Sequence, residues 1–292
     1  MIRQTVYTCV AAFLLAAAGC TEYGGGAGVV PEVTVLAADA SAAEPSGEAA
    51  EGSADATAES ATGGAGPGTF TGQVKLVGTA PSLSLLVAKG SNVKDAEVCA
   101  AVDVADERLV VSPAGGVANV FIWLKSPPKG GTPLPESDEA VIFDQKNCQF
   151  LPHAMVVPVK RTVKVLSADA VAHNTHTYPA KNDALNQGVQ PNDREGKLSF
   201  QYKKPESVPV SVTCDFHAWM KAWHLPVDHP YAAVSDAEGN FTISDLPPGK
   251  HTFLVWHESV NGNFIERKLE VTIKPGETTT QEIPLAVDRL KL

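Results

Sequence analysis

Several features of common protein classes are missing from this sequence of 292 residues. The motifs of serine hydrolases, zinc proteases and phosphate-binding loops (G-x-S-x-G, H-E-x-x-H and a glycine-rich P-loop) are absent. No repeat with a period of about 20 to 50 residues and no amphipathic helix of useful length is evident after the N-terminal segment. These absences argue against the common hydrolases and against repeat or helical architectures.

Basic residues are also scarce, and their distribution is informative. The chain has 23 basic and 33 acidic residues, a net charge of -10. Residues 21–68 hold eight acidic residues and no basic one, whereas residues 69–292 are nearly balanced, with 25 acidic and 22 basic. The folded part therefore lacks the basic excess typical of nucleic-acid binding. Residues 21–68 are rich in Ala, Gly, Ser and Glu, and we predict a disordered linker because they bury too little apolar surface.

The apolar run near the N-terminus is too short to span a bilayer. Arg3 is followed by the apolar residues 10–18 and by small residues that lead to Cys20, the pattern of a secretory signal over residues 1–20. The end of this segment, Ala-Gly-Cys, resembles the lipobox of bacterial lipoproteins. The resemblance implies that Cys20 is lipidated and that the protein is anchored in the cell envelope, on the periplasmic or outer face of a membrane. An ordinary signal peptide that ends beside a cysteine is the alternative.

Only five cysteines occur, and Cys9 and Cys20 belong to this N-terminal segment. In an oxidising compartment the remaining three, Cys99, Cys148 and Cys214, form an odd set, which suggests one pair and one functional thiol. We assign Cys99 and Cys148 to a disulfide, which leaves Cys214 free. The alternative is that Cys99 and Cys148 are unpaired thiols in the core.

Cys214 opens the stretch with the richest chemistry. Alternating valines at 208–212 predict a strand, and Cys214 continues their inward face. His217 and Met220 follow in the same loop, and His173 comes after another strand-like run upstream. One thiolate, two imidazoles and a weak thioether form the ligand set of a blue copper site. Zinc is less well served, because no second C-x-x-C or H-x-x-x-H pair is present.

The pair His173-Asn174, followed 41 residues later by Cys-x-x-His-x-x-Met, resembles the cupredoxins and, among them, the amicyanin type. The resemblance covers residues 139–229, about a third of the chain. It implies a cupredoxin-like Greek-key β-sandwich that holds one type 1 copper ion. It also implies His173, Cys214, His217 and Met220 as the copper ligands, and Asn174 as the residue whose backbone N–H orients the sulfur.

Other side chains near these ligands have expected roles. Because His217 lies between two ligands of one loop, we expect its outer ring edge to meet solvent and to serve as the exit for electrons. Trp219 is interpreted either as part of an exposed apolar docking patch or as a packed core residue. His176 is expected to face solvent or to support the ligands. A second, catalytic copper would need several scattered histidines to converge and is the less favoured interpretation.

The last segment, residues 230–292, has β pattern throughout, with turns at 236–240, 247–250 and 261–262 between alternating apolar runs. The run from Gly239 to His257 resembles the carboxypeptidase regulatory-like (prealbumin-like) β-sandwich, a fold also grouped with carbohydrate-binding-like folds. The segment is short for a seven-stranded sandwich. Its missing strands would come from residues 69–138 if the copper domain is inserted between two halves, an arrangement that the sequence leaves open.

We therefore predict an all-β protein. Its segments are a signal peptide (1–20), a linker (21–68), an N-terminal β region (69–138), a cupredoxin-like copper domain (139–229) and a prealbumin-like β-sandwich (230–292). The expected function is that of an exported, lipid-anchored electron carrier, not an enzyme, with a redox partner such as a cytochrome or an oxidase.

Two other functions are carried alongside this one. The first is a module that binds carbohydrate, a polysaccharide or a surface protein through its C-terminal sandwich, with a structural or vestigial copper site. The second is copper storage or sensing, which requires copper binding without fast reversible redox chemistry.

Overall fold

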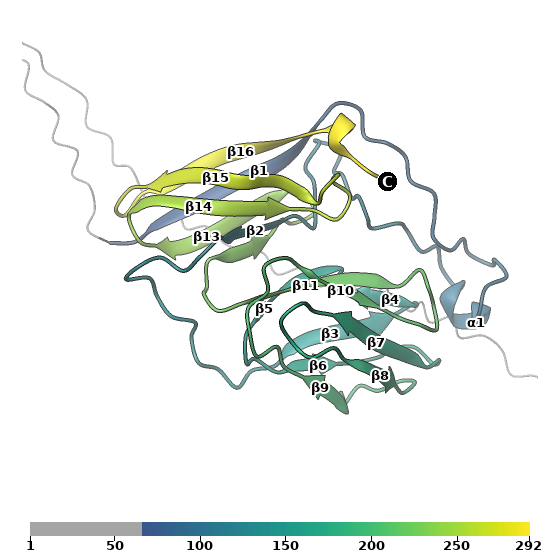
Figure 1. The fold of residues 1–292 in the computed structure, drawn as a ribbon. Coiled ribbons are helices and arrows are strands. Elements are labelled where there is room, and N and C mark those ends of the chain that lie inside the picture. Colours follow the sequence, from purple (N-terminus) through teal and green to yellow (C-terminus); the bar gives the residue numbers. More distant parts are fainter. Residues whose placement is uncertain (1–65) are drawn as a thin grey trace, which may run out of the picture. The chain divides into compact units, whose positions relative to one another are not determined.

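The computed structural model describes residues 66–292, and this part of the chain is almost entirely β-structure, which confirms the expected all-β class (Figure 1). The predicted signal segment 1–20, with Cys20, and nearly all of the predicted linker 21–68 lie outside the described residues. Among residues 66–292, no helix combines the length and hydrophobicity needed to cross a membrane. The elements are β1 (Gly68–Val77), α1 (Ala96–Cys99), β2 (Phe121–Leu124), β3 (Val141–Lys146), β4 (Gln149–Leu151), β5 (Ala154–Pro158), β6 (Val163–Val165), β7 (His173–Tyr178), β8 (Asn186–Val189), β9 (Leu198–Phe200), β10 (Val210–Thr213), β11 (Lys221–Val227), β12 (Ala232–Val234), β13 (Asn240–Leu246), β14 (Gly249–Trp256), β15 (Phe264–Ile273), β16 (Thr278–Ala286) and the 3-10 turn η1 (Val287–Arg289).

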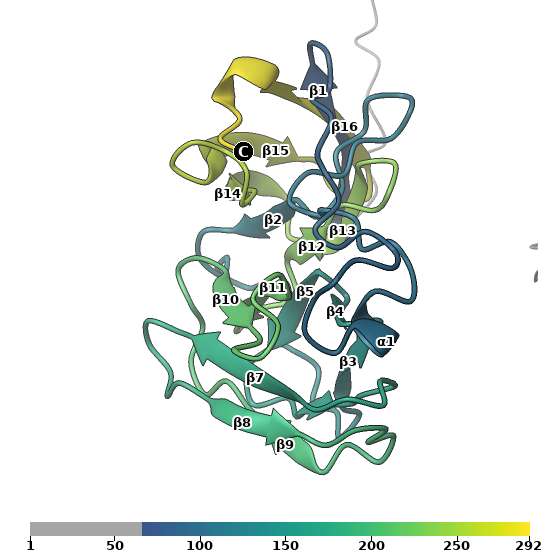
Figure 2. The same ribbon diagram turned by 90° about the vertical axis from the view of Figure 1, so that its right-hand side faces the viewer.

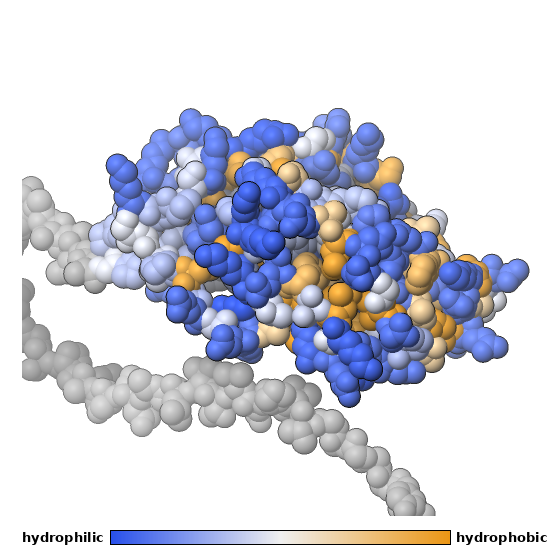
Figure 3. All heavy atoms as spheres, turned by 60° about the horizontal axis from the view of Figure 1, so that its bottom comes forward, coloured by the Kyte–Doolittle hydropathy of each residue, from blue (hydrophilic) through white to orange (hydrophobic). Residues whose placement is uncertain are grey.

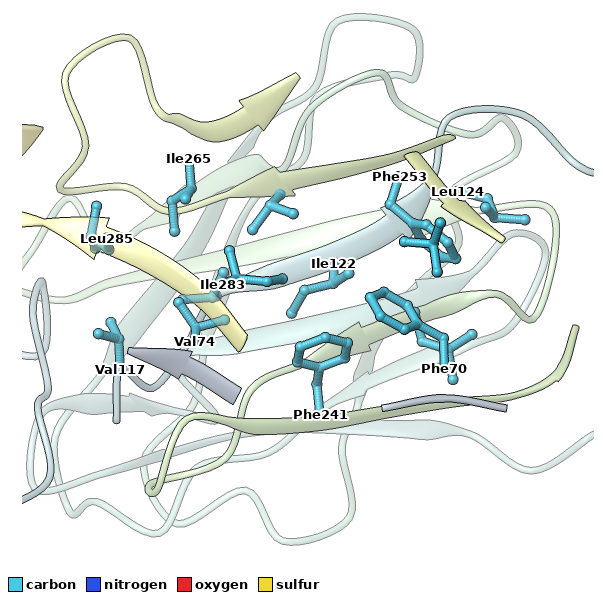
Figure 4. Close-up of a cluster of buried hydrophobic side chains, with 14 of the residues drawn as sticks. Phe70, Val74, Val117, Ile122, Leu124, Phe241, Phe253, Ile265, Ile283 and Leu285 are labelled. Atoms are coloured by element: carbon cyan, nitrogen blue, oxygen red, sulfur yellow. The ribbon is translucent and has the colours of Figure 1, made fainter. Parts of the chain in front are cut away.

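One pair of sheets combines strands from both ends of the described chain. The first sheet has the order β13-β1-β16, and the second has the order β12-β2-β14-β15. β1 runs parallel to β16 and antiparallel to β13, while β2 pairs with β12 and β14. Residues before 139 and after 229 therefore share the same two sheets. A single cluster of buried side chains fills the space between these sheets (Figure 4).

β1 shows why this arrangement forms. Its residues alternate between buried and half-buried, and Phe70, Val74 and Leu76 point into the core. The other face carries the half-buried residues Thr69, Thr71, Gln73 and Lys75, so a register slip of one residue would turn the apolar side chains out of the core. Gly72 is required for the pairing, because a Cβ at this position would lie 2.0 Å from the carbonyl oxygen of Gln281 on β16.

The second pair of sheets is built from residues 141–227 and is here called the 141–227 sandwich. A five-stranded sheet has the order β5-β11-β10-β7-β8, and a four-stranded sheet has the order β4-β3-β6-β9. Neighbouring strands are distant in sequence, since β5 pairs with β11 and β3 with β6, both in parallel. The core between these sheets holds Phe143, Val165, Val212 and Tyr202, together with Cys214 and Met220. The loop that carries the predicted ligands, residues 214–220 (here called the ligand loop), thus directly follows the core strand β10.

A separate apolar cluster joins the two sandwiches. It contains Phe121 and Trp123 of β2 together with Leu225 and Val227 of β11, all buried, and it includes Trp256 of β14. Aromatic rings meet here edge to face, as in the pair Trp223 and Trp256, whose centroids are 4.8 Å apart. Strand β11 therefore contributes to two cores, one on each side of its sheet.

The chain between β1 and β2 leaves the first sandwich, carries α1 and returns (Figure 2). Cys99, the last residue of α1, is joined to Cys148, which lies between β3 and β4. This covalent bond links a segment that belongs to no sheet to the core of the 141–227 sandwich. Both cysteines are fully buried.

Some large apolar side chains remain at the surface. Figure 3 shows a face on which hydrophobic residues lie among hydrophilic ones. Three of them belong to the 141–227 sandwich: Ile142, Tyr178 and Val208, which are 46%, 51% and 40% exposed. In the ligand loop, Phe216 is 43% exposed and has the ammonium of Lys94 over its ring at 4.8 Å.

His224, on β11, is a fully buried ionisable side chain of the 141–227 sandwich. Its ring packs against Phe143, with centroids 4.5 Å apart, and Nδ1 lies 3.1 Å from the hydroxyl of Tyr202. Burial raises the pKa of Tyr202, so the hydroxyl keeps its proton. Burial also lowers the pKa of His224 to about 3, and the ring is neutral in the folded protein.

This neutral histidine makes stability depend on pH. In the unfolded chain the His224 imidazole binds a proton below about pH 6.5, whereas in the folded chain it binds one only below about pH 3. In metal-free protein we expect the unfolding free energy to fall by up to about 1.4 kcal/mol per pH unit in this window from His224 alone. The measurement is chemical denaturation between pH 7 and pH 4. His224→Phe should lower this slope by one proton, whereas Tyr202→Phe should keep it. An unchanged slope in His224→Phe contradicts the assignment.

Candidate metal centre

Three potential metal-ligand atoms converge at one end of the 141–227 sandwich. His173 begins β7, Cys214 follows β10, and His217 lies in the loop between β10 and β11. The Nδ1 atoms of the two imidazoles are 3.1 Å apart, and Sγ of Cys214 lies 4.0 Å from Nδ1 of His173 and 3.8 Å from Nδ1 of His217. All three residues are buried, with 0%, 2% and 0% of their surface exposed.

The local fold explains this convergence. β10 pairs antiparallel with β7, with Thr213 opposite His176, so the end of β10 lies beside the start of β7. Val210 and Val212 point into the core, and Cys214 continues their face. The loop then turns back through two backbone hydrogen bonds, from Met220 N–H to the carbonyl of His217 (2.9 Å) and from Cys214 N–H to the carbonyl of Met220 (3.3 Å). Met220 re-enters the same buried cluster as Cys214 and is 2% exposed.

The electrostatics of this site favour a thiolate. Burial alone opposes ionisation of Cys214, but hydrogen bonds from both imidazoles and from the backbone N–H of Asn174 lower the pKa of the thiol to about 6. At neutral pH the thiolate, which is the metal-binding form, predominates. The backbone contact of Asn174 to the sulfur is the one that the cupredoxin resemblance implies.

The side chain of Asn174 holds the loop from the other side. Its Oδ1 accepts a hydrogen bond from the backbone N–H of Asp215 at 2.6 Å. Its amide donates to Oδ2 of Asp215 at 2.9 Å and to Oδ1 of Asn186 on β8 at 2.8 Å. Asn174 is 3% exposed, so these bonds replace water that the amide has lost. His176 contacts the same Asp215 at 3.0 Å and takes no place among the converging donors.

Two carboxylates bind the outer nitrogens of the imidazoles. Oδ2 of Asp169 lies 2.9 Å from Nε2 of His173, and Oδ2 of Asp95 lies 2.9 Å from Nε2 of His217. Asp169 is itself held by the backbone N–H groups of Asn147 and Cys148 at 2.6 and 2.8 Å. Burial opposes its charge, yet these bonds and the imidazole lower the pKa of Asp169. With Nε2 engaged, each ring turns Nδ1 toward Cys214.

Sequence reasoning identified neither carboxylate. Asp169 stands four residues before His173, and a search for acids at that spacing is a signal that points to it. Asp95 is 122 residues from His217 in an irregular segment, and no local pattern connects the two residues.

The expectation that the ring edge of His217 meets solvent is wrong. The side chain is 0% exposed, because Asp95 covers Nε2 and Trp219 packs nearby, with ring centroids 5.3 Å apart. Trp219 is half-buried, and its indole N–H donates to the carbonyl of Cys148 at 3.1 Å. Of the two interpretations of Trp219, packing against the core is the one that the structure supports. A cavity of about 180 Å³ lies beside it, lined also by Met220 and His153.

The disulfide lies directly against this site. Among residues 66–292, three groups of His, Cys, Asp or Glu have donor atoms within 4.8 Å of one another, and all three share this location. One group is His173, Cys214 and His217, and the other two bring Cys148 next to His217 and His173. The remaining histidines bond elsewhere, for example His229 to the carbonyl of Leu124. No second histidine-rich cluster occurs in this described part of the chain.

Comparison with known families matches part of the chain. A family model described as polysaccharide lyase family 4, domain II, matches residues 209–281, which are 73 of the 292 residues. The matched range includes the ligand loop and strands β12 to β15, and it ends within β16. No curated protein matches the chain.

The solved structures with similarity to this chain include copper proteins. A copper-containing nitrite reductase from Thermus scotoductus SA-01 is 15% identical and has a TM-score of 0.27, with 35% of this chain matched to 27% of that protein. A reduced Cu(I) form of an amicyanin variant is 16% identical (36% of this chain, 98% of that one, TM-score 0.26). A purple cupredoxin from Nitrosopumilus maritimus is 18% identical (30% and 100%, TM-score 0.25). The chain thus spans about a quarter of the nitrite reductase and nearly all of the two smaller proteins.

The hydrogen bonds of Asn174 lead to a prediction about stability. Asn174→Ala leaves the backbone N–H of Asp215 without its acceptor and removes two further bonds, and we expect a loss of about 1–3 kcal/mol of unfolding free energy. Guanidinium denaturation of metal-free protein measures this loss. Asn186→Ala, at the exposed end of the same network, is the matched control and should cost less than Asn174→Ala. Equal losses in the two variants contradict a special role for the buried amide.

Proposed function

We propose that this protein binds one copper ion in a type 1 site and carries single electrons. The observation that supports the proposal best is the convergence of His173 Nδ1, Cys214 Sγ and His217 Nδ1 within 3.1 to 4.0 Å of one another in a buried site. A metal ion about 2 Å from nitrogen and about 2.3 Å from sulfur needs donors separated by roughly 3 to 4 Å. The residues present therefore fit a metal ion.

The donor set favours copper over zinc. One thiolate and two neutral imidazoles form a trigonal set, and Met220 is buried in the same loop as a weak thioether donor. Structural zinc sites take four strong ligands, and within residues 66–292 no fourth His, Cys, Asp or Glu joins this group. Copper supplies one-electron redox chemistry in such a site.

The chain holds its donor atoms in place before any ion arrives. The imidazoles are oriented by carboxylates at Nε2, and the sulfur is held by the backbone N–H of Asn174. A site whose ligands move little between two oxidation states transfers electrons with little reorganisation. All three donors are buried, which leaves no solvent-facing position for a substrate, and we therefore propose a carrier and not an enzyme.

The proposal extends to location and partners. The signal pattern of residues 1–20 and Cys20 support export and a lipid anchor, and the acidic linker 21–68 would separate the folded part from the membrane surface. We propose a position in the cell envelope, on the periplasmic or outer face of a membrane. A cytochrome or an oxidase is the proposed redox partner.

A spectroscopic test addresses the copper site. One equivalent of Cu(II) added to the purified protein should give the intense visible band of a copper–thiolate bond, and ascorbate should bleach it. Cys214→Ala, His173→Ala and His217→Ala should each abolish the band, because each removes one donor from the trigonal set. The matched control is His251→Ala, whose ring bonds to the carbonyl of Pro247 in the other sandwich. A type 1 site is contradicted if copper binds without this band or if the band persists in Cys214→Ala. Copper binding without colour would point to copper storage instead.

The family-model match favours a second candidate function. Residues 209–281 match a domain that is described as part of a polysaccharide lyase family. Strands β1 and β2 complete the two sheets to which β12 to β16 belong. This topology supports a prealbumin-like sandwich into whose chain residues 141–227 are inserted. We propose carbohydrate or surface-protein binding by this sandwich as the alternative function.

This alternative has its own measurement. Metal-free protein should migrate more slowly in gels that contain soluble polysaccharides if the sandwich of β1, β2 and β12 to β16 binds sugar. The Cys214→Ala variant should be retarded equally. Because the copper ligands lie in the other sandwich, their loss should not matter. Migration that is unchanged by every polysaccharide contradicts sugar binding and leaves the copper proposal untouched.

A further inference from the structure

The histidine of the ligand loop is closed off by a segment from far away in the sequence. Nε2 of His217 lies 2.9 Å from Oδ2 of Asp95, the residue just before α1. His217 is 0% exposed, whereas the side chain of Asp95 is 34% exposed and lies between the ring and solvent. Asp95 has a left-handed backbone with φ 54°, an uncommon conformation for a residue other than glycine. A specific local structure therefore presents this carboxylate.

Residues 87–104 form a closed segment, here called the cover. Its ends are joined by a hydrogen bond from Val104 N–H to the carbonyl of Val87 at 2.8 Å. Gly90 N–H bonds to the carbonyl of Ala100 at 2.8 Å, and Lys89 N–H bonds to Oδ1 of Asp103 at 2.7 Å. The cover has its own small apolar cluster of Val87, Ala100 and Val104, and Trp219 of the ligand loop packs against this cluster.

The disulfide anchors the cover beside the metal centre. Cys99 lies one helical turn after Asp95, and its N–H bonds to the carbonyl of Asp95 at 2.9 Å. The partner, Cys148, donates its backbone N–H to Asp169, which holds the other imidazole. The sulfurs of Cys99 and Cys148 and a ring nitrogen of His217 lie within 4.8 Å of one another. The disulfide thus links the segment that carries Asp95 to the segment whose backbone N–H binds Asp169.

This geometry has a chemical consequence for His217. A carboxylate that accepts from Nε2–H keeps the proton on that nitrogen, so that Nδ1, which faces Cys214, is the nitrogen that would bind a metal ion. Its negative charge also strengthens the imidazole as a ligand and stabilises Cu(II) relative to Cu(I). The covered ring edge is unavailable to a docking protein, because the cover occupies that position.

We propose that Asp95 is a positioning residue for the copper loop and that residues 87–104 are a disulfide-anchored cover that keeps the ring edge of His217 from redox partners. The proposal rests on the proposed copper function for its redox consequence. The closure of His217 itself does not depend on copper and is measurable in metal-free protein.

The metal-free test follows the ring proton by NMR. In the full chain without copper, Nε2–H of His217 should exchange slowly with solvent, because Asp95 accepts its hydrogen bond and the cover closes that ring edge. Asp95→Asn should accelerate exchange, and Asp95→Glu should restore part of the protection. The matched control is Asp183→Asn, which makes the same charge change at a 92% exposed carboxylate and should leave exchange unchanged. Fast exchange in the unaltered protein overturns the cover.

The copper-loaded test separates positioning from simple structural support. Asp95→Asn should keep the copper–thiolate band, raise the reduction potential and lower Cu(II) affinity by about 10- to 100-fold. Asp183→Asn should change neither quantity. Asp95→Ala, which opens the ring edge without breaking the disulfide, should increase the electron self-exchange rate severalfold, and Cys99→Ser with Cys148→Ser should do so further if that variant folds.

The outcomes distinguish the two proposals. If the unaltered protein never shows the copper–thiolate band, the proposed function fails, and slow exchange at His217 still supports the cover. If the band is present but Asp95→Asn leaves the potential and the affinity unchanged, the positioning role fails and the copper proposal stands. A self-exchange rate that stays the same in Asp95→Ala overturns the blocking role of the cover.

Discussion

The proposed metal centre depends on the antiparallel pairing of β7 with β10. Val212 lies opposite Thr177 and Thr213 opposite His176, so the end of β10, which Cys214 follows, lies beside the half of β7 that begins with His173. Cys214 and His173 meet for this reason. Because side chains alternate along a strand, a slip of one residue in this register would turn the sulfur out of the core. The short loop that follows needs only two backbone hydrogen bonds to bring His217 back.

Charge at this centre is tolerated in the interior because every charged group has a partner. The thiolate of Cys214 faces two imidazoles, each imidazole faces a carboxylate, and Asp169 receives two backbone N–H groups. His224 shows the opposite case in the same sandwich. It is equally buried but has only a hydroxyl as its partner, so desolvation dominates and the ring stays neutral. The carboxylate partners, and not burial alone, distinguish His173 and His217 from His224.

The two sandwiches are coupled through strands that are distant in sequence. β1 runs along the whole length of β16, from Thr69 opposite Thr278 to Val77 opposite Ala286. The 141–227 sandwich is inserted between the strands that this pairing joins, and β11 packs against the aromatic cluster of the other sandwich. The segment that carries Asp95 follows β1 and reaches the ligand loop of the 141–227 sandwich. The two sandwiches thus share one continuous chain path.

The amino-acid sequence alone determined the all-β class and the local order of the candidate ligands. Alternation in β10 and the spacing Cys214, His217 and Met220 are local properties, so they can be predicted without a fold. The pairing of Cys99 with Cys148 was inferred from cysteine count, and the structure places the two residues together. Only the tertiary structure revealed Asp95 against His217, because a contact across 122 residues has no periodic signature. The loop histidine is buried for that reason, since chain topology decides which distant segment covers a local motif.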